Sequence, residues 1–192
     1  MGTRKVKLTG IGYWAKVFED NRDPTGYDGA LEDVGGQTTI DVDLDQDEMA
    51  KLVQSKSMKR GRPSDDNEGM TRVKFTRKWE HVIQTKKGPM DLGGPPKVLK
   101  ADNTEWDYDV DGPIGNGSTV EVVLSVYDTA RKAIVGTRLD RVKVLHHIPY
   151  DPDAADDDTP TAPLPKAAPK PTARSAPKAA PTPQFEDDDI PF

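Results

Sequence analysis

The sequence predicts a mainly β domain with one short helix, followed by a disordered C-terminal tail. Five segments between residues 13 and 148 have the length and alternating polarity of β-strands. A single segment has the spacing of an amphipathic helix. The composition changes after Tyr150, because residues 151–192 contain 10 of the 17 prolines and no glycine. Such a segment buries too little apolar surface to offset the entropy of ordering it, so the folded domain is predicted to span residues 1–150.

The first predicted strand covers residues 13–18 and places Trp14, Lys16 and Phe18 on one face. The second covers residues 38–45, where apolar side chains alternate with aspartates. One face of this second strand carries Ile40, Val42 and Leu44, and the other carries Asp41, Asp43 and Asp45. Residues 47–58 predict a helix, since acidic side chains occupy the first turn and apolar side chains lie on one side.

Three further strands are predicted at residues 71–80, 117–129 and 135–148. Residues 88–96 contain three glycines and three prolines, which predicts a loop. Five strands with little helix favour a five-stranded barrel of the OB type, because a closed barrel has no long exposed edge. A β-sandwich is the alternative that strand number alone leaves open.

The charge of the chain is unevenly distributed. The whole sequence has 27 basic and 33 acidic side chains, a net charge of −6. Residues 55–100 nevertheless hold 12 basic and 5 acidic groups, so the centre of the domain is basic. The lack of cysteine excludes disulfides, a catalytic thiol and cysteine-ligated zinc. No apolar run reaches the ~18 residues of a membrane span, and no secretory signal follows Met1. We therefore expect a cytoplasmic protein with no membrane partner.

A basic centre that also carries aromatic rings is typical of a surface that binds single-stranded nucleic acid. Cations follow the phosphates, and flat rings stack on bases of any sequence. The predicted DNA-binding residues lie on the first strand, after the helix and on the third strand: Trp14, Lys16, Phe18, Lys56, Lys59, Arg60, Arg62, Arg72, Lys74, Arg77, Lys78 and Trp79. Two alternatives stay open, namely that the rings belong to the core and that the basic cluster at 56–62 is only a solvated surface.

The end of the chain has a different pattern. Residues 151–184 predict a disordered Pro/Ala-rich linker with repeated Pro-Lys pairs. Residues 185–192 predict an acidic tip that binds partner proteins through Asp187, Asp188, Asp189, Ile190, Pro191 and Phe192. The apolar side chains of such a peptide can enter a pocket while basic groups of the partner hold the carboxylates. An acidic solubilising tail is the alternative.

Two stretches resemble known families. Residues 185–192 are similar to the C-terminal tip of bacterial single-stranded DNA-binding proteins, which end in an acidic run followed by Ile-Pro-Phe. Residues 114–150 resemble bacteriophage single-stranded DNA-binding proteins with an OB fold, through the glycine-rich segment 114–118, the valine-rich strand, Tyr127, Gly136 and the last strand. Gly12 followed by Tyr13-Trp14-Ala15 fits the same group.

The resemblance implies a core that coats and protects single-stranded DNA without sequence specificity during replication, recombination or repair. It also implies that the tip recruits replication, recombination or repair proteins, and that the protein is a monomer or a dimer.

No catalytic constellation is recognisable in the sequence, so we expect neither enzymatic activity nor a cofactor. His146 and His147 are adjacent on a predicted strand and point to opposite faces, which makes a shared metal site poor. One alternative is a phage nuclease in which Asp41, Asp43 and Asp45 hold Mg²⁺. A second alternative is an adaptor whose tip docks partners and whose core does not bind DNA.

Overall fold

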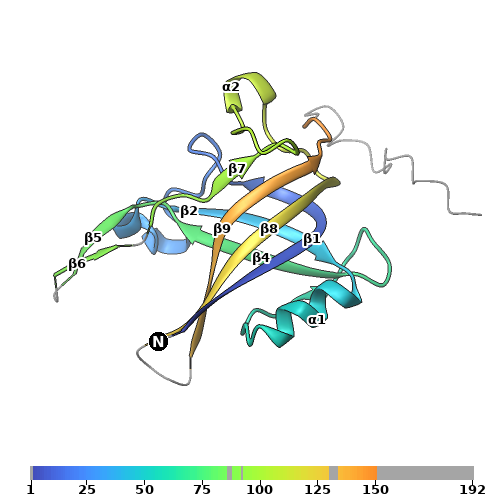
Figure 1. Ribbon diagram of the computed structural model, residues 1–192. Helices are drawn as coiled ribbons and strands as arrows, with labels where there is room; N and C mark the ends of the chain where they lie inside the picture. The colour runs from blue at the N-terminus through green and yellow to red at the C-terminus, as the bar shows by residue number, and fades with distance from the viewer. Residues whose placement is uncertain (1, 86–87, 92, 130–133, 151–192) are drawn as a thin grey trace, which may run out of the picture. The chain divides into compact units, whose positions relative to one another are not determined.

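Five long antiparallel strands form a small barrel in the computed structural model, which describes residues 2–85, 88–91, 93–129 and 134–150 (Figure 1). They are β1 (Thr3–Lys16), β2 (Gln37–Leu44), β4 (Thr71–Lys78), β8 (Ser118–Asp128) and β9 (Val135–His146). Hydrogen-bonded neighbours follow the order β4-β2-β1-β8-β9, so β1 lies in the middle. The predicted mainly β fold, a five-stranded OB-type barrel, is confirmed.

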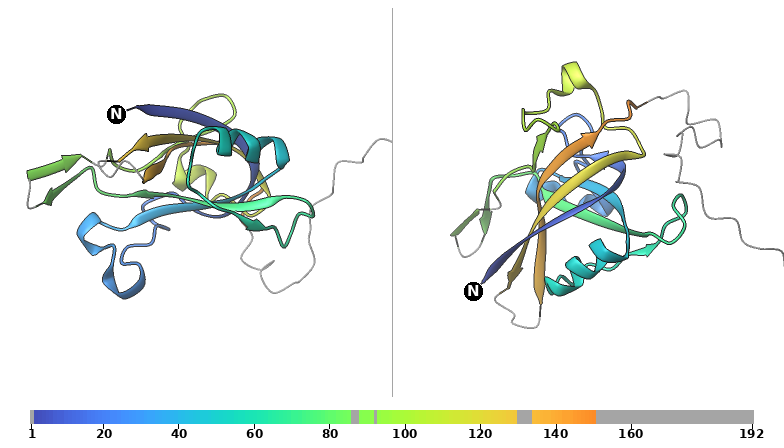
Figure 2. Two further views of the ribbon diagram at one scale, coloured as in Figure 1. Left: turned by 90° about the horizontal axis from the view of Figure 1, so that it is seen from below. Right: turned by 45° about the vertical axis from the view of Figure 1, so that its right-hand side comes forward.

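Shorter elements flank the barrel. They are β3 (Arg62–Pro63), β5 (Val82–Thr85), β6 (Gly88–Asp91), β7 (Lys97–Leu99), α1 (Gln46–Gln54), α2 (Tyr108–Asp111) and two 3-10 turns, Tyr27–Gly29 and Glu32–Val34. β3 extends the sheet beside β4, and β7 runs parallel to β9 at the other edge. Figures 1 and 2 show α1 and α2 on opposite sides of the barrel and the β5–β6 hairpin extending away from it.

The barrel closes where β4 and β9 lie side by side, a place that we call the seam. The two strands are not hydrogen-bonded neighbours in the sheet order. A side chain crosses between them instead, since Nη1 of Arg77 on β4 donates to the carbonyl of Leu139 on β9 at 3.1 Å. The seam is therefore joined by a guanidinium group.

Alternate positions of the strands fill the interior. On β2, the predicted inward face of Ile40, Val42 and Leu44 is fully buried. The same period of two buries Val73 and Phe75 on β4 and Val120, Val122 and Leu124 on β8. On β9 the buried residues are Leu139, Val142 and Val144, and a register shift interrupts the period between the first two. Gly10 of β1 lies against β2, where a Cβ atom would be 2.3 Å from the carbonyl oxygen of Asp43. A side chain at that position would push the two strands apart.

The helix α1 begins at the residue after Asp45, whose side chain accepts a hydrogen bond from the backbone N–H of Glu48 at 2.8 Å. This is an N-cap, which satisfies one of the free amide groups of the first turn. Leu52 on the inner side of α1 is buried in the core. The helix ends at Gln54 rather than at residue 58, because Lys56 has a left-handed backbone with φ 63°.

Most strand predictions match, with three differences. β1 begins at Thr3 rather than at residue 13, although Val6 and Leu8 already alternate with lysines there. The predicted loop at 88–96 contains β6, and the short strands β3, β5 and β7 were not predicted. The predicted linker 151–184 and tip 185–192 lie outside the described residues. Within the described part of the chain, no helix is both long and apolar enough to cross a membrane.

Candidate nucleic-acid interface

The outer face of β1, β2 and β4 carries polar and aromatic side chains in cross-strand rows. Tyr13, Asp41 and Lys74 lie opposite one another in the three strands. Lys16 lies opposite Thr39 in the neighbouring row. Residues that face each other across a sheet point to the same side, so these rows share one surface. We call it the outer face.

An open groove of about 350 Å³ lies on this outer face. Its lining is mostly basic: Asp41, Arg60, Gly61, Arg62, Arg72 and Lys74. Arg60, Arg62 and Lys74 are exposed to solvent. The only carboxylate in the lining belongs to Asp41, whose Oδ1 is 3.7 Å from Nζ of Lys74. The exposed side chains of this basic groove therefore carry more positive than negative charge.

Lys59 lies close to the same groove and is half-buried. Burial and the charge of Lys74 lower the pKa of Lys59, and the opposite charge of Asp41 offsets this only in part. A lowered lysine pKa means that the ammonium group lacks a sufficient counter-charge in the free protein. An anion bound between Lys59 and Lys74 would supply it.

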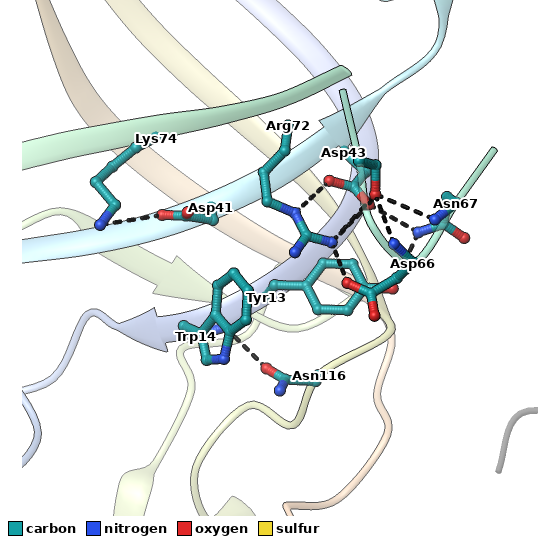
Figure 3. A network of polar contacts seen from close by, with 10 residues as sticks. Tyr13, Trp14, Asp41, Asp43, Asp66, Asn67, Arg72, Lys74 and Asn116 are labelled. Atoms are coloured by element: carbon teal, nitrogen blue, oxygen red, sulfur yellow. Dashed lines mark hydrogen bonds and ion pairs between the residues drawn. The ribbon is translucent and has the colours of Figure 1, made fainter. Parts of the chain in front are cut away.

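Trp14 presents the most exposed tryptophan ring of the described chain, with 48% of the residue accessible. The pairing of β1 with β2 shifts register between Tyr13 and Lys16, which marks a β-bulge. Trp14 sits in this bulge with φ 46°, a left-handed backbone that is rare for a non-glycine residue. Bulges re-aim side chains, and here an indole points outward beside the basic groove (Figure 3).

Arg72 was expected to contact DNA, but the structure places it in the interior, where it is only 2% exposed. Its Nε and Nη2 donate to the two carboxylate oxygens of Asp43 at 2.6 and 2.8 Å. Nη2 also donates to Asp66 at 2.6 Å. These bonds raise the pKa of Arg72, so it is a permanent cation whose charge is neutralised inside the protein. It is a structural residue beneath the outer face.

The carboxylate of Asp43 is the centre of this network (Figure 3). Burial opposes its ionisation, but hydrogen bonds from Arg72, Ser64 and Asn67 outweigh burial and lower the pKa of Asp43. Asn67 donates to Asp43 at 2.7 Å and to the hydroxyl of Tyr13 at 2.9 Å. The network thus ties the segment after β3 to the outer face of β1 and β2.

Arg77 also departs from expectation, since it is only 8% exposed. Besides bonding to Leu139, it donates to the carbonyls of Gly93 and Gly94 and to the carboxylate of Asp140. All of these partners lie on β9 or in the segment before β7. Arg77 is therefore removed from the DNA-contacting residues.

The remaining predicted DNA-binding residues occupy different places. Lys16 at the end of β1 and Lys78 at the end of β4 are exposed, and Lys56 is exposed but does not line the basic groove. Phe18 packs against the core, as the core alternative anticipated, and its ring lies 4.9 Å from that of Tyr108. Trp79 is half-buried, with the guanidinium carbon of Arg22 4.6 Å from its ring centroid.

Phe18 and Trp79 also line a second open groove, of about 370 Å³, together with Trp106, His81 and two prolines, Pro95 and Pro96. Because β1 and β4 both end at this side of the barrel, the second groove lies beyond the last row of the outer face.

The three aspartates that a nuclease would need do not gather at one site. Asp43 is paired with Arg72, Asp41 lies beside Lys74, and Asp45 caps α1. Asp45 follows the end of β2, so it does not share the strand face that alternation predicted. No group of three histidines, cysteines or carboxylates is placed to hold a metal among the residues that the structure describes.

Sequence reasoning missed the supporting residues Tyr13, Asn67 and Asn116. Asn116 Oδ1 accepts a hydrogen bond from the backbone N–H of Trp14 at 2.8 Å, although 102 positions separate them in the sequence. Nothing local to either residue indicates this contact. The alternating aspartates of β2 facing a basic strand were a usable signal for the Asp43–Arg72 pair, once the register is known.

Comparisons with protein-family models and with curated proteins give no match. Solved structures do match. The fold is similar to that of gp2.5, a single-stranded DNA-binding protein encoded by bacteriophage T7, with a TM-score of 0.51 and 17% identity, over 86% of this chain and 100% of that chain.

It is also similar to the single-stranded DNA-binding protein from bacteriophage Enc34 in a C-terminal truncation, with a TM-score of 0.51 and 14% identity over 78% of this chain and 88% of that one. The structure of the same phage protein in complex with single-stranded DNA matches with a TM-score of 0.50 and 15% identity, over 77% of this chain and 88% of that one. The structural neighbours are thus bacteriophage single-stranded DNA-binding proteins, and the likeness establishes a shared fold.

Proposed function

We propose that this protein binds single-stranded DNA, without sequence specificity, along the outer face of β1, β2 and β4. One observation carries the proposal: the exposed indole of Trp14 stands beside the basic groove that Arg60, Arg62 and Lys74 line. Single-stranded DNA needs such a pair of features, positive charge along its backbone and a flat ring for its bases. In a duplex the bases are already stacked, so the ring has nothing to bind.

The fold supports this assignment. In OB barrels the face of the second and third strands binds oligonucleotides, and β2 and β4 hold those positions in this barrel. The Enc34 protein, which shares the fold, has been solved in complex with single-stranded DNA. The groove on the present outer face is basic and open, as that use requires.

The biological role that we propose is to coat and protect transient single strands during replication, recombination or repair in the cytoplasm of a host cell. The tip, residues 185–192, recruits the proteins that act on those strands. The core acts as a monomer or dimer, without catalysis. The sequence of the tip and the placement of Asp41, Asp43 and Asp45 in separate structural roles support this reading over a nuclease.

The test measures fluorescence anisotropy of labelled oligo-dT, a mixed-sequence strand and a duplex over a series of salt concentrations. We expect both single strands to bind with similar affinity and the duplex to bind weakly. The logarithm of the association constant should fall linearly with the logarithm of the salt concentration, with a slope of about −0.7 per phosphate contacted. Arg60→Ala should make this slope shallower by about 0.7, the value for one phosphate contact, whereas Lys51→Ala on α1 should not change it.

Trp14→Ala should weaken oligo-dT binding by ~1–3 kcal/mol, which is about 5- to 150-fold. Tyr27→Ala is the control, because Tyr27 is 94% exposed and lies in the 3-10 turn between β1 and β2 instead of on a strand of the outer face. Equal affinity for duplex and single strand would refute the proposal. Cleavage of the strand with Mg²⁺ would support the nuclease, and intact tip docking with no DNA binding would support the adaptor.

A further inference from the structure

Trp14 is held in place before any ligand arrives. The left-handed backbone at φ 46° is unfavourable for a residue with a Cβ atom, so the surrounding structure must maintain it. Asn116 supplies one restraint, since its Oδ1 accepts the hydrogen bond from Trp14 N–H at 2.8 Å. The next residue, Gly117, donates its N–H to the carbonyl of Gly12 at 3.0 Å. The segment before β8 thus bonds to β1 within the bulge, at Trp14, and just before it, at Gly12.

The second restraint acts on the ring. The guanidinium carbon of Arg72 lies 4.8 Å from the indole centroid of Trp14 and 4.0 Å from the ring centroid of Tyr13. Figure 3 shows the guanidinium group over these rings. Its Nη1 is buried and has no hydrogen-bond partner among the described residues. Cation–π attraction to the two rings accounts for this unpaired nitrogen.

The side chain of Arg72 is itself fixed in place. Its two other nitrogens are fixed by Asp43 and Asp66, and its side chain is 1% exposed. A planar guanidinium can bond to a carboxylate with two nitrogens while its flat face meets an aromatic ring, which a lysine cannot do. The buried ion pair therefore acts as a rigid support beneath an otherwise exposed indole.

We infer that Arg72 and Asn116 are positioning residues that preorganise Trp14 as a base-stacking platform. The inference rests on the proposed function, since it assigns how that site reaches its affinity. A ring that is fixed in the free protein loses little side-chain entropy when a base stacks on it. Freeing the ring should therefore weaken binding by about two- to tenfold, although neither Arg72 nor Asn116 touches DNA.

A double-mutant cycle with oligo-dT tests this reasoning. We expect Asn116→Ala to weaken binding by about two- to tenfold in the native protein and by less than twofold in the Trp14→Ala background. Arg72→Lys should show the same pattern of losses, and its thermal midpoint reports whether this variant is folded. Asn103→Gly is the matched control: Asn103 lies in another loop, is exposed and has φ 70°, which glycine adopts freely. An equal loss with and without Trp14 would mean a direct contact by Asn116 and would overturn the inference, as would no loss at all.

A second measurement separates this inference from the proposed function. Protein labelled with 5-fluorotryptophan has a ¹⁹F resonance for each indole, and Trp14→Phe identifies that of Trp14. In the free protein, Asn116→Ala should shift or broaden the Trp14 signal and leave those of Trp79 and Trp106 in place. An unchanged Trp14 signal would refute the positioning role. If oligo-dT does not bind even the native protein, the proposed function fails, while the ¹⁹F result still decides whether Trp14 is held.

Discussion

Arg77 closes the barrel, so replacing it should open the seam between β4 and β9. The change that we propose is Arg77→Met, which keeps an unbranched apolar side chain in place of the arginine stem and removes every donor. In the native protein this guanidinium bonds to the carbonyls of Gly93, Gly94 and Leu139 and to the carboxylate of Asp140. No backbone ladder between β4 and β9 can take over.

The expected loss of stability follows from these contacts. Removing one partner of a buried ion pair destabilises a protein by ~3–5 kcal/mol. Asp140 retains Lys5 at 2.6 Å and Arg138 at 3.0 Å, so its charge is not left alone. Burial and the nearby charge of Arg138 lower the pKa of Arg77, which shows that the native charge is held at a cost that methionine avoids. We therefore expect the lower end of the range, about 3 kcal/mol.

For a domain of this size a loss of about 3 kcal/mol lowers the thermal midpoint by about 6–12 °C, at ~2–4 °C per kcal/mol. Circular dichroism of the full chain during heating measures it. The control is Lys78→Met on the same strand, since Lys78 is exposed and should change stability by less than about 0.5 kcal/mol. Oligo-dT affinity is measured well below both midpoints.

Two results would refute this reasoning. Equal thermal midpoints for Arg77→Met and Lys78→Met would show that the guanidinium does not hold the seam. An affinity loss for folded Arg77→Met as large as that for Arg60→Ala would return Arg77 to the DNA-contacting residues.

Three other predictions concern protonation and the tail. Burial and the charge of Lys74 lower the pKa of Lys59, and a bound phosphate would favour the charged form of this lysine. Oligo-dT affinity should therefore fall as the pH rises, starting below the ordinary lysine pKa of about 10.4. Lys59→Arg should reduce this fall, and an identical pH profile would exclude Lys59 from the site. The pKa of Asp43 is lowered in the folded state, so its pairing stabilises the protein fully above the unfolded carboxyl pKa of about 3.9, and this stabilisation is lost as pH falls through the lower folded value. In urea unfolding, Asp43→Asn should be less stable than the native protein at pH 7 and its stability should depend less on acid pH. An unchanged acid dependence would contradict this. Deleting residues 185–192 should raise DNA affinity, and most at low salt, where the charge of the tip is least screened. Both this deletion and Phe192→Ala should abolish docking of host replication or repair proteins in a pull-down. Docking that survives Phe192→Ala would make the tip an electrostatic tail only.

The strands could be predicted because their signal is local. Ile40, Val42 and Leu44 alternate with polar residues, and a strand with one buried face has that period wherever it lies in a barrel. The basic character of residues 55–100 followed from composition. Trp14 was among the predicted DNA-binding residues, but the bulge that turns its ring outward was not predicted. The start of β1 was missed because its few apolar residues, Val6 and Leu8, stand among charges.

Which of the charged residues face solvent was decided by tertiary structure alone. Arg72 and Lys74 have the same period and similar chemistry, yet one is buried and the other is exposed. The difference arises because the register of β4 sets Arg72 opposite Asp43, 29 residues away, and the segment after β3 covers the pair with Asp66. Alternation states which side of a strand a residue takes, and only the packing of distant segments determines whether that side meets water.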